Sequence, residues 1–180
     1  MAKINAKRRI LKIVVTGPES SGKSTLAAYL HQQINCVLVE EQSRLYLESL
    51  DRPYLQEDLI KIARQQYSAE MQAMTNNNCV ICDTSIEVIK IWYEFKYGLC
   101  PSEISSKLEP ARVDLYLLCA PDLPWVLDPL RESPNDRTQL FRLYKDWLES
   151  EQVPYLVIQG EQSTREKAAL DAVNSLRRTN

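Results

Sequence analysis

The fold of this chain is decided by residues 17–24, which read Gly17-Pro18-Glu19-Ser20-Ser21-Gly22-Lys23-Ser24. They match the pattern G-x-x-x-x-G-K-[S/T] at every fixed position, directly after an apolar run and directly before a stretch of helical period. In that context the loop turns its backbone N–H groups inward around an anion, and the following helix adds its free amides and its dipole. The sequence therefore predicts a phosphate-binding loop between a strand and a helix.

Residue types within this loop suit a nucleoside triphosphate with Mg²⁺. Lys23 should reach the β- and γ-phosphates, and the Ser24 hydroxyl should bind the metal. Gly22 lets the backbone approach the phosphates closely. We therefore expect ATP and Mg²⁺ as cofactors, bound by Gly17, Glu19, Ser20, Ser21, Gly22, Lys23, Ser24 and Thr25.

Along the rest of the chain, apolar runs of strand length alternate with longer stretches of helical period. The runs are nearly continuous in Val, Ile, Leu and Cys, which is typical of parallel strands buried on both faces. The expected strands are Ile10–Thr16, Cys36–Glu40, Cys79–Asp83, Asp114–Cys119 and Tyr155–Gln159. Helices are expected over 23–34, 55–75 and 85–97, with a last one from Ser163. This alternation predicts an α/β fold with a parallel sheet.

Length and charge restrict the classes of protein to which the chain can belong. A chain of 180 residues fits one domain, 1–180, and a net charge of −2 argues against an extended nucleic-acid surface. We interpret 1–9, which ends in Lys7-Arg8-Arg9, as a solvated basic tail. No apolar run reaches the ~20 residues of a membrane span, and no signal-peptide cleavage site follows the first apolar stretch. We therefore expect a cytoplasmic protein.

The five cysteines predict free thiols in a reducing compartment, because their number is odd and no secretion signal precedes them. Cys79 and Cys82 have the spacing of a redox or zinc pair. They lie within a strand, where positions i and i+3 point to opposite faces. We therefore interpret them as buried strand residues.

Acidic residues stand at the ends of two predicted strands. Asp83 ends the third strand, where it is expected to hold a Mg²⁺-bound water or a substrate hydroxyl; a helix N-cap is the alternative. Glu41 follows the second strand, with Arg44 three residues later. Because the carboxyl ends of parallel strands face the ligand, Glu41 can accept the proton of an attacking hydroxyl while Arg44 orients the acceptor. A solvated helix start is the alternative for this pair.

The segment 120–137 interrupts the alternation of strands and helices. It reads APDLPWVLDPLRESPNDR, which holds too many prolines for a regular helix and too many apolar residues for a solvated linker. We interpret it as a lid over the site, with a structural loop as the alternative. Arg131 and Arg137 in this lid can clamp the charge of a transferring phosphoryl group.

Three further side chains are candidates for contact with an acceptor. Gln66 interrupts the apolar face of the helix over 55–75, which indicates a pocket or a partly exposed face. Trp92 and Trp125 can stack on a heterocycle, and core packing is the alternative for each.

Over about 10 to 176, the chain resembles the ribosylnicotinamide kinase domain of the NadR family. The matching segments are TGPESSGKST, VEEQSRLY, DLIKIARQQ, CDTS with IWYEFKYG, DLYLLCAPDLPWVLDPLR, and YLVIQG with Arg165. The resemblance implies a three-layer P-loop NTPase fold of the nucleoside-kinase type, with a five-stranded parallel sheet of order 2-3-1-4-5, flanking helices and a lid. The chain departs from the family at Gln42, where an aromatic residue is usual, and at Pro129, where the lid usually has glycine.

The resemblance also implies an activity, the ATP-dependent phosphorylation of the ribose 5′-hydroxyl of nicotinamide riboside to nicotinamide mononucleotide in NAD salvage. Two other functions stay open: a kinase for another (deoxy)nucleoside, and a regulatory module that binds ATP without kinase turnover. The oligomeric state stays open as well. The resemblance further implies a role for each matching site residue. Lys23 and Ser24 would hold triphosphate and Mg²⁺, Asp83 would lie between metal and acceptor, and Glu41 and Arg44 would face the acceptor. Trp92 would stack on the nicotinamide, Arg131 and Arg137 would belong to the lid, and Gly160 and Arg165 would belong to the adenine-side loop.

Overall fold

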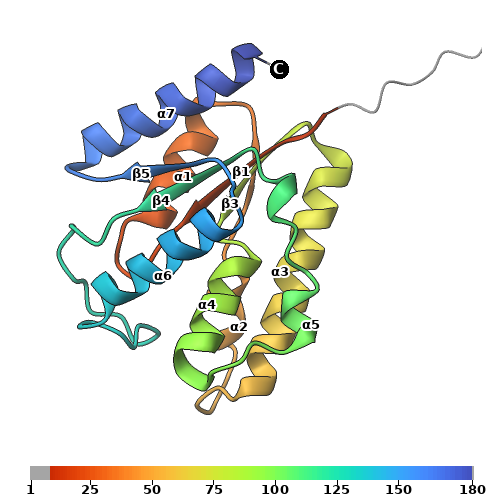
Figure 1. The fold of residues 1–180 in the computed structure, drawn as a ribbon, viewed down its shortest axis with the longest axis vertical. Coiled ribbons are helices and arrows are strands. Elements are labelled where there is room, and N and C mark those ends of the chain that lie inside the picture. Colours follow the sequence, from red (N-terminus) through yellow and green to blue (C-terminus); the bar gives the residue numbers. More distant parts are fainter. Residues whose placement is uncertain (1–8, 180) are drawn as a thin grey trace, which may run out of the picture.

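The computed structural model describes residues 9–179 and contains a parallel sheet of five strands (Figure 1). The strand order is β2-β3-β1-β4-β5, so the expected α/β fold and the order 2-3-1-4-5 are confirmed. The strands are β1 (Leu11–Thr16), β2 (Val37–Val39), β3 (Cys79–Asp83), β4 (Leu115–Cys119) and β5 (Tyr155–Ile158). Most of the expected basic tail lies outside the described residues, and Arg9 pairs with Asp114 at 2.7 Å.

Seven α-helices and one short 3₁₀-helix connect and cover the strands within the described part of the chain. They are α1 (Lys23–Gln33), α2 (Gln42–Glu48), α3 (Gln56–Asn76), α4 (Ile86–Tyr97), α5 (Ser102–Ser105), the 3₁₀-helix Pro110–Arg112, α6 (Arg137–Ser150) and α7 (Gln162–Thr179). The four predicted helices are present with starts within one residue. Arg137, which the sequence analysis placed in the lid, is the first residue of α6. None of the helices in residues 9–179 has the length and apolarity needed to span a membrane.

Helices cover both faces of the sheet, which explains its nearly continuous apolar strands (Figure 1). Successive strand residues point to opposite faces. On one face, Ile13 and Val15 of β1 pack with α1 and α7; on the other, Val14 packs with α4 and α6. All three side chains are fully buried. The buried sheet therefore holds the end of β1, where the phosphate-binding loop begins, in a fixed place.

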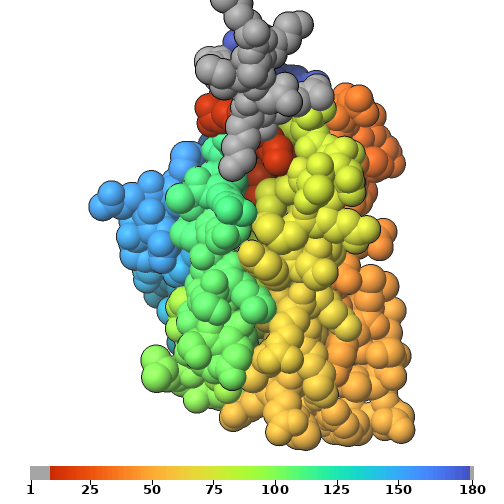
Figure 2. All heavy atoms as spheres, turned by 90° about the vertical axis from the view of Figure 1, so that its right-hand side faces the viewer, coloured from red at the N-terminus to blue at the C-terminus, as the bar shows by residue number. Residues whose placement is uncertain are grey.

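A second layer of apolar packing lies among α3, α4 and α5, beside the sheet. Its buried members include Ile62, Ile89 and Ile104, one from each helix. The space-filling view shows α3 alongside the later segment that contains α5 (Figure 2). This packing makes α3 and α4 a firm wall next to the carboxyl ends of the strands.

The expectation of free thiols is wrong for two of the five cysteines. Cys36, just before β2, and Cys79, the first residue of β3, form a disulfide with a Cα–Cα distance of 4.5 Å. The parallel register of β2 and β3 pairs Val37 with Val80, which brings the preceding residues together across 43 positions of sequence. Cys82, Cys100 and Cys119 are free and buried. Burial was predicted for Cys79 and Cys82 of the strand; it is confirmed for Cys82, whereas Cys79 is half-buried.

Asp58 secures the turn that leads into α3. Its side chain has no solvent exposure, and its carboxylate accepts hydrogen bonds from the Leu55 amide at 2.8 Å, the Arg52 guanidinium at 2.7 Å and the Tyr46 hydroxyl at 2.8 Å. The Arg52 hydrogen bond is the main reason that the pKa of Asp58 lies well below its ordinary value. This carboxylate therefore fixes the segment that carries Tyr54, a residue of the pocket described below.

We expect Asp58→Asn to lower the free energy of unfolding by about 1–3 kcal/mol, because the Arg52 guanidinium and the Leu55 amide lose a buried, charged acceptor. A carboxyl whose pKa is depressed in the folded state stabilises that state fully at pH values above its pKa in the unfolded chain, which is about 3.9. The difference between wild type and variant should therefore persist at neutral pH and shrink as the pH falls below about 4. Urea denaturation at several pH values measures this difference in the free energy of unfolding. Exposed Glu57→Gln, in the same helical turn, is the matched control, and an equal loss in both variants would contradict the assignment.

Candidate active site

The shape of the loop between β1 and α1 depends on glycines and on its own hydrogen bonds. Gly17 has φ 132°, and a Cβ there would lie 2.6 Å from the Cys119 carbonyl oxygen. Gly22 has φ 80° and is the N-cap of α1. The Pro18 carbonyl accepts hydrogen bonds from Ser21 Oγ at 2.7 Å and from Lys23 Nζ at 2.8 Å. The loop is therefore turned sharply around the N-terminus of α1, whose free amides suit an anion.

A polar pocket opens directly above this loop. It is lined by the loop, by the start of α2 and by part of the segment between β4 and α6. Its residues are Glu19, Ser20, Ser21, Gly22, Lys23, Ser24, Thr25, Glu41, Ser43, Arg44, Leu47, Leu130 and Arg131. The pocket thus combines backbone amides with one lysine and two arginines, as binding of a polyphosphate requires.

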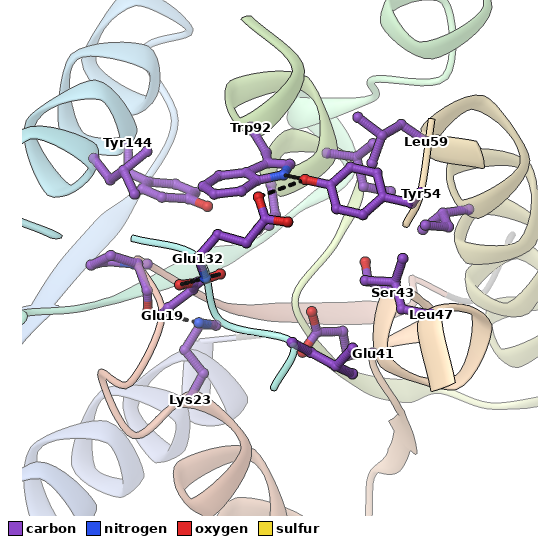
Figure 3. Close-up of a pocket in the computed structure, with 17 residues that line it drawn as sticks. Glu19, Lys23, Glu41, Ser43, Leu47, Tyr54, Leu59, Trp92, Glu132 and Tyr144 are labelled. Atoms are coloured by element: carbon purple, nitrogen blue, oxygen red, sulfur yellow. Dashed lines mark hydrogen bonds between the residues drawn. The ribbon is translucent and has the colours of Figure 1, made fainter. Parts of the chain in front are cut away.

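An aromatic pocket adjoins the polar pocket (Figure 3). Part of its wall comes from α3, α4 and α6, and it carries three aromatic rings. Its residues are Gly17, Pro18, Glu19, Lys23, Glu41, Ser43, Leu47, Tyr54, Leu59, Ile62, Val88, Ile89, Trp92, Leu130, Glu132, Leu140 and Tyr144. Lys23 and Glu41 line both pockets, so the two cavities share one charged wall.

Glu41 is one of two carboxylates that line both pockets, and the other is Glu19 (Figure 3). Burial raises its pKa above the ordinary value of 4.5, and the negative charge of Asp83 raises it further. The charges of Lys23 and Arg44 oppose the rise. A carboxylate in such surroundings can accept a proton more readily than one in water.

Asp83 lies at the end of β3 and is 7% exposed, but it does not line either pocket. Burial raises its pKa, and a hydrogen bond with Ser24 opposes that rise. Its Oδ1 is buried without a hydrogen-bond partner among the described residues. An unpaired carboxylate oxygen beside a hydroxyl fits the oxygen donors that Mg²⁺ prefers.

Across residues 9–179, no three His, Cys, Asp or Glu side chains gather to hold a metal ion. Mg²⁺ commonly takes one or two protein ligands and completes its shell with water and substrate phosphates. Ser24 and Asp83 therefore suit a cation that arrives with a nucleotide.

The segment 120–136, which we name the β4–α6 loop, lies over the phosphate-binding loop. Glu19 accepts hydrogen bonds from the Glu132 amide at 3.1 Å and the Ser133 amide at 3.1 Å. Ser20 Oγ accepts one from the Val126 amide at 2.9 Å. The β4–α6 loop is thus attached to Glu19 and Ser20, two of the four residues of the phosphate-binding loop whose identity the sequence pattern leaves undefined.

The two arginines predicted for the lid occupy different places. Arg131 lines the polar pocket and donates to the Val126 carbonyl at 2.7 Å. Arg137 lines neither pocket, and its guanidinium donates to the carbonyl groups of Pro121 and Leu123. The ring of Trp125 lies 5.9 Å from that guanidinium and is likewise outside both pockets. Arg137 and Trp125 therefore fold the base of the β4–α6 loop in this structure.

Arg44 is a second attachment of the β4–α6 loop. It lines the polar pocket from α2, and its guanidinium donates to Asp128 Oδ2 at 2.7 Å. Asp128 Oδ1 also accepts a hydrogen bond from the Leu130 amide at 2.9 Å, on the other side of Pro129. This ion pair joins the start of α2 to the middle of the loop.

One hydrogen-bonded cluster occupies the far side of the aromatic pocket (Figure 3). The Tyr54 hydroxyl accepts from Trp92 Nε1 at 2.9 Å and from Lys96 Nζ at 2.8 Å, and it donates to Glu132 Oε2 at 3.0 Å. Lys96 also donates to that oxygen at 2.8 Å. The hydroxyl thereby uses its full capacity, and the carboxylate of Glu132 is directed into the pocket.

Three further residues predicted to contact ligand, besides Asp83, Arg137 and Trp125, lie outside both pockets. Arg165 is 2% exposed and donates to the carbonyl groups of Ser21, Ala120 and Gly160, so it supports the phosphate-binding loop from below. Gly160 itself donates to Asp122 Oδ2 at 2.6 Å. Gln66 is buried beside the two acidic strand ends, and its contacts are described below.

Sequence reasoning missed Tyr54, Glu132 and Tyr144, which all line the aromatic pocket. The inward position of Tyr144 could have been predicted from the sequence, because the residues at 140, 141, 144, 147 and 148 have the spacing of the apolar face of an amphipathic helix. Tyr54 and Glu132 lie in irregular segments, and no local pattern indicates that they meet. Their place depends on tertiary contacts.

The chain belongs to the AAA domain family, whose sequence pattern matches residues 12–166. No curated protein matches the chain.

Solved structures share the fold. A NadR protein in complex with NR has a TM-score of 0.75 at 24% identity, covering 93% of this chain and 51% of that one. A NadR protein in complex with NAD and AMP-PNP has a TM-score of 0.71 at 22% identity, covering 93% and 49%. Deoxyadenosine kinase from M. mycoides has a TM-score of 0.67 at 14% identity, covering 92% and 100%. This chain thus spans about half the length of the NadR chains, and the NadR-like fold expected from the sequence is confirmed.

We expect Glu19→Ala to free the β4–α6 loop, because the amides of Glu132 and Ser133 lose their acceptor. Amide hydrogen exchange of these two residues should become about tenfold faster, in line with the loss of roughly one net hydrogen bond. Glu161→Ala, at an exposed glutamate, is the control and should leave the exchange unchanged. Equal exchange in wild type and Glu19→Ala would show that Glu19 does not hold the loop.

Proposed function

We propose that this chain is an ATP-dependent kinase that phosphorylates the ribose 5′-hydroxyl of nicotinamide riboside, giving nicotinamide mononucleotide. The observation that carries the proposal is the wall shared by the polar and aromatic pockets, which includes Lys23 and Glu41. A phosphoryl group on one side of this wall meets a hydroxyl on the other. The fold shared with a NadR protein in complex with NR supports the choice of acceptor.

ATP binds with its phosphates in the polar pocket. The amides at the N-terminus of α1 and the Lys23 ammonium hold the β- and γ-phosphates. Arg131 faces the same pocket from the β4–α6 loop and stabilises charge on the transferring group. Gly160 and Arg165 belong to the adenine side, where Arg165 also supports the loop through the Ser21 carbonyl.

Ser24 and Asp83 would hold Mg²⁺, directly or through water. The metal supplies charge neutralisation between the phosphates when it is bound. Asp83 is excluded from both pockets and has a free Oδ1, which favours this role over contact with the acceptor.

Glu41 acts as the general base. It accepts the proton of the 5′-hydroxyl while the hydroxyl oxygen attacks the γ-phosphorus, and ADP leaves with the electron pair of the broken P–O bond. Its place at the junction of the pockets puts it on the path between acceptor and phosphate. Arg44, three residues on, orients the acceptor or the phosphate from the same side.

The aromatic pocket takes the nucleoside base. Trp92 and Tyr144 offer ring faces, and Glu132 adds a carboxylate beside them (Figure 3). A cationic pyridinium ring is attracted both by aromatic faces and by a carboxylate. Trp125 and Gln66, which lie outside this pocket, contact the acceptor only if the site rearranges on binding.

The β4–α6 loop serves as the lid, with Arg137 at its base. Its contacts with Glu19 and Ser20 place it over the phosphate-binding loop, where it excludes water from the transferred group and limits hydrolysis of ATP. In this proposal the whole chain, 1–180, is one kinase domain.

The proposal is tested by ADP release from MgATP against a panel of nucleosides, with Lys23→Ala as control. We expect nicotinamide riboside to stimulate turnover most strongly, and Lys23→Ala to abolish the stimulation, because the variant loses the ammonium that holds the β- and γ-phosphates. Chromatography should detect nicotinamide mononucleotide in amounts equal to the ADP formed.

Other outcomes of the panel select between the alternatives. Stimulation by a different nucleoside would keep the mechanism and discard nicotinamide riboside; M. mycoides deoxyadenosine kinase shares this fold along its whole length. Binding of ATP without stimulation by any nucleoside would instead favour a regulatory module.

We expect Glu41→Gln to lower kcat by roughly 10²–10⁴-fold with little change in the KM for ATP, because an amide cannot accept the proton. Since burial raises the pKa of Glu41, wild-type activity should rise with pH through an apparent pKa above 4.5, and the variant should lack this acid limb. Asp83→Asn should instead raise the Mg²⁺ concentration needed for half-maximal rate. The opposite result would be a large loss of kcat in Asp83→Asn with a normal Mg²⁺ dependence, together with an active Glu41→Gln. It would make Asp83 the general base and exclude Glu41 from that role.

A further inference from the structure

Gln66 of α3 connects two turns that are far apart in the sequence. It is 1% exposed, and its Oε1 accepts a hydrogen bond from the Gln42 amide at 3.1 Å. Its Nε2 donates to the Thr84 carbonyl at 3.3 Å and to Glu70 Oε1 at 2.9 Å. Gln42 directly follows Glu41, and Thr84 directly follows Asp83. One side-chain amide thus joins the turns that carry both acidic residues of the site.

Only one orientation of the Gln66 amide satisfies all three partners. The Gln42 amide can only donate, so it must face the carbonyl oxygen of the side chain. The Thr84 carbonyl can only accept, and an ionised Glu70 likewise accepts, so both must face the NH₂ group. Neither a carboxylate nor an apolar side chain of the same size can replace this combination of donor and acceptor.

The bridge lies where the sheet itself no longer connects β2 and β3. Their parallel pairing ends with Val39 opposite Cys82. Beyond that pair, the Gln66 side chain accepts a hydrogen bond from the Gln42 amide, which follows β2, and donates one to the Thr84 carbonyl, which follows β3. It therefore does for the two strand ends what a backbone peptide group does within a ladder.

A buried ion pair fixes Gln66 from the opposite side. Lys12 of β1 donates to Glu70 Oε2 at 2.6 Å, and the two side chains are 5% and 2% exposed. Glu70 has its other oxygen on Gln66. Buried charges of this kind are stable only when paired and hydrogen-bonded, so the chain from Lys12 to Gln66 admits little movement.

Thr84 shows that the β3 turn needs such support. It is 2% exposed and has φ 66°, a left-handed conformation that costs free energy for a residue other than glycine. Its amide donates to the Val15 carbonyl at 2.9 Å, and its carbonyl reaches Gln66. The turn after Asp83 is therefore held by β1 on one side and by Gln66 on the other.

We propose that Gln66 is a positioning residue that holds the ends of β2 and β3 together and so sets the place of Glu41 relative to Asp83, with Glu70 and Lys12 fixing its orientation. This inference rests on the proposed function for its kinetic consequences. Two carboxylates near each other repel, so their spacing does not maintain itself and has to be imposed by the surrounding structure. Gln66 touches neither carboxylate, and it acts through the backbone next to each.

The test begins with Gln66→Met, which keeps the side-chain volume and removes every hydrogen bond. Amide exchange at Gln42 should become at least about tenfold faster. With the acceptor identified by the panel, kcat should fall about 10–100-fold while both KM values stay within about threefold, as a misplacement of about 1 Å predicts. Met74→Ala, a core change in α3 away from these turns, is the control for lost stability and should leave kcat unchanged.

A double-variant cycle separates positioning from general destabilisation. If Gln66 acts through the base, Gln66→Met should lower kcat by less than about threefold when Glu41→Gln is already present. An equal loss in both backgrounds, or an equal loss in Met74→Ala, would overturn the proposal. Failure of the proposed function gives a different result, because the wild type would then transfer phosphate to no acceptor. The bridge itself is tested independently of activity: unchanged amide exchange at Gln42 in Gln66→Met would overturn it.

A second pair of variants decides the matter if Gln66→Met does not fold. Gln66→Glu cannot donate to Thr84 or to Glu70 and brings a second carboxylate beside Glu70, so kcat should fall as well. The Q66E/E70Q double variant removes the repulsion between the two carboxylates but returns no donor to the Thr84 carbonyl, so kcat should stay well below that of the wild type. Full recovery of kcat in this double variant would count against the bridge.

Discussion

The sharp turn between β1 and α1 is the constraint on which the remainder of the site depends. Gly17 passes so close to the Cys119 carbonyl that a Cβ would lie 2.6 Å from it, so the loop can only pack against β4 without a side chain. Several later residues of the loop then have partners from other segments. Glu19 holds the amides of the β4–α6 loop, and the Ser21 carbonyl is held by Arg165 of α7. The loop is both the phosphate site and the point where distant segments join.

Burial of charge gives the site its chemical character. Glu41 and Asp83 lie at the ends of neighbouring strands, and burial raises the pKa of each. The ammonium of Lys23 opposes both rises in pKa, because a nearby positive charge favours the ionised form of a carboxyl. The same low-dielectric surroundings strengthen every interaction that a transferring phosphoryl group would make.

A polar chain inside the core supports this arrangement. Lys12, Glu70 and Gln66 are all buried, yet each has hydrogen-bond partners, and the chain ends on backbone groups beside the two acidic strand ends. A purely apolar core would leave those backbone groups without partners beyond the last ladder pair. The buried polar side chains of α3, Gln66 and Glu70, therefore support the site and do not face solvent.

Much of the fold was determined by sequence alone, because it depends on local periodicity. Continuous apolar runs predicted the five parallel strands, and the glycine-rich pattern before Lys23 predicted the phosphate-binding loop between β1 and α1. Both signals arise within a few residues, since strand burial and the turn around an anion are local properties. The placement of Asp83 and Glu41 near one edge followed from the rule that parallel strands share their carboxyl ends.

Only the tertiary structure decided which polar side chains face the pockets. Gln66 and Arg165 read as ligand contacts in the sequence, but α3 and α7 direct them to backbone groups of other segments. Tyr54 and Glu132, 78 residues apart, meet at 3.0 Å because α3, α4 and the β4–α6 loop converge there. The direction of a side chain depends on how whole helices pack against the sheet, and the free energy of that packing is spread over contacts that no short stretch of sequence contains.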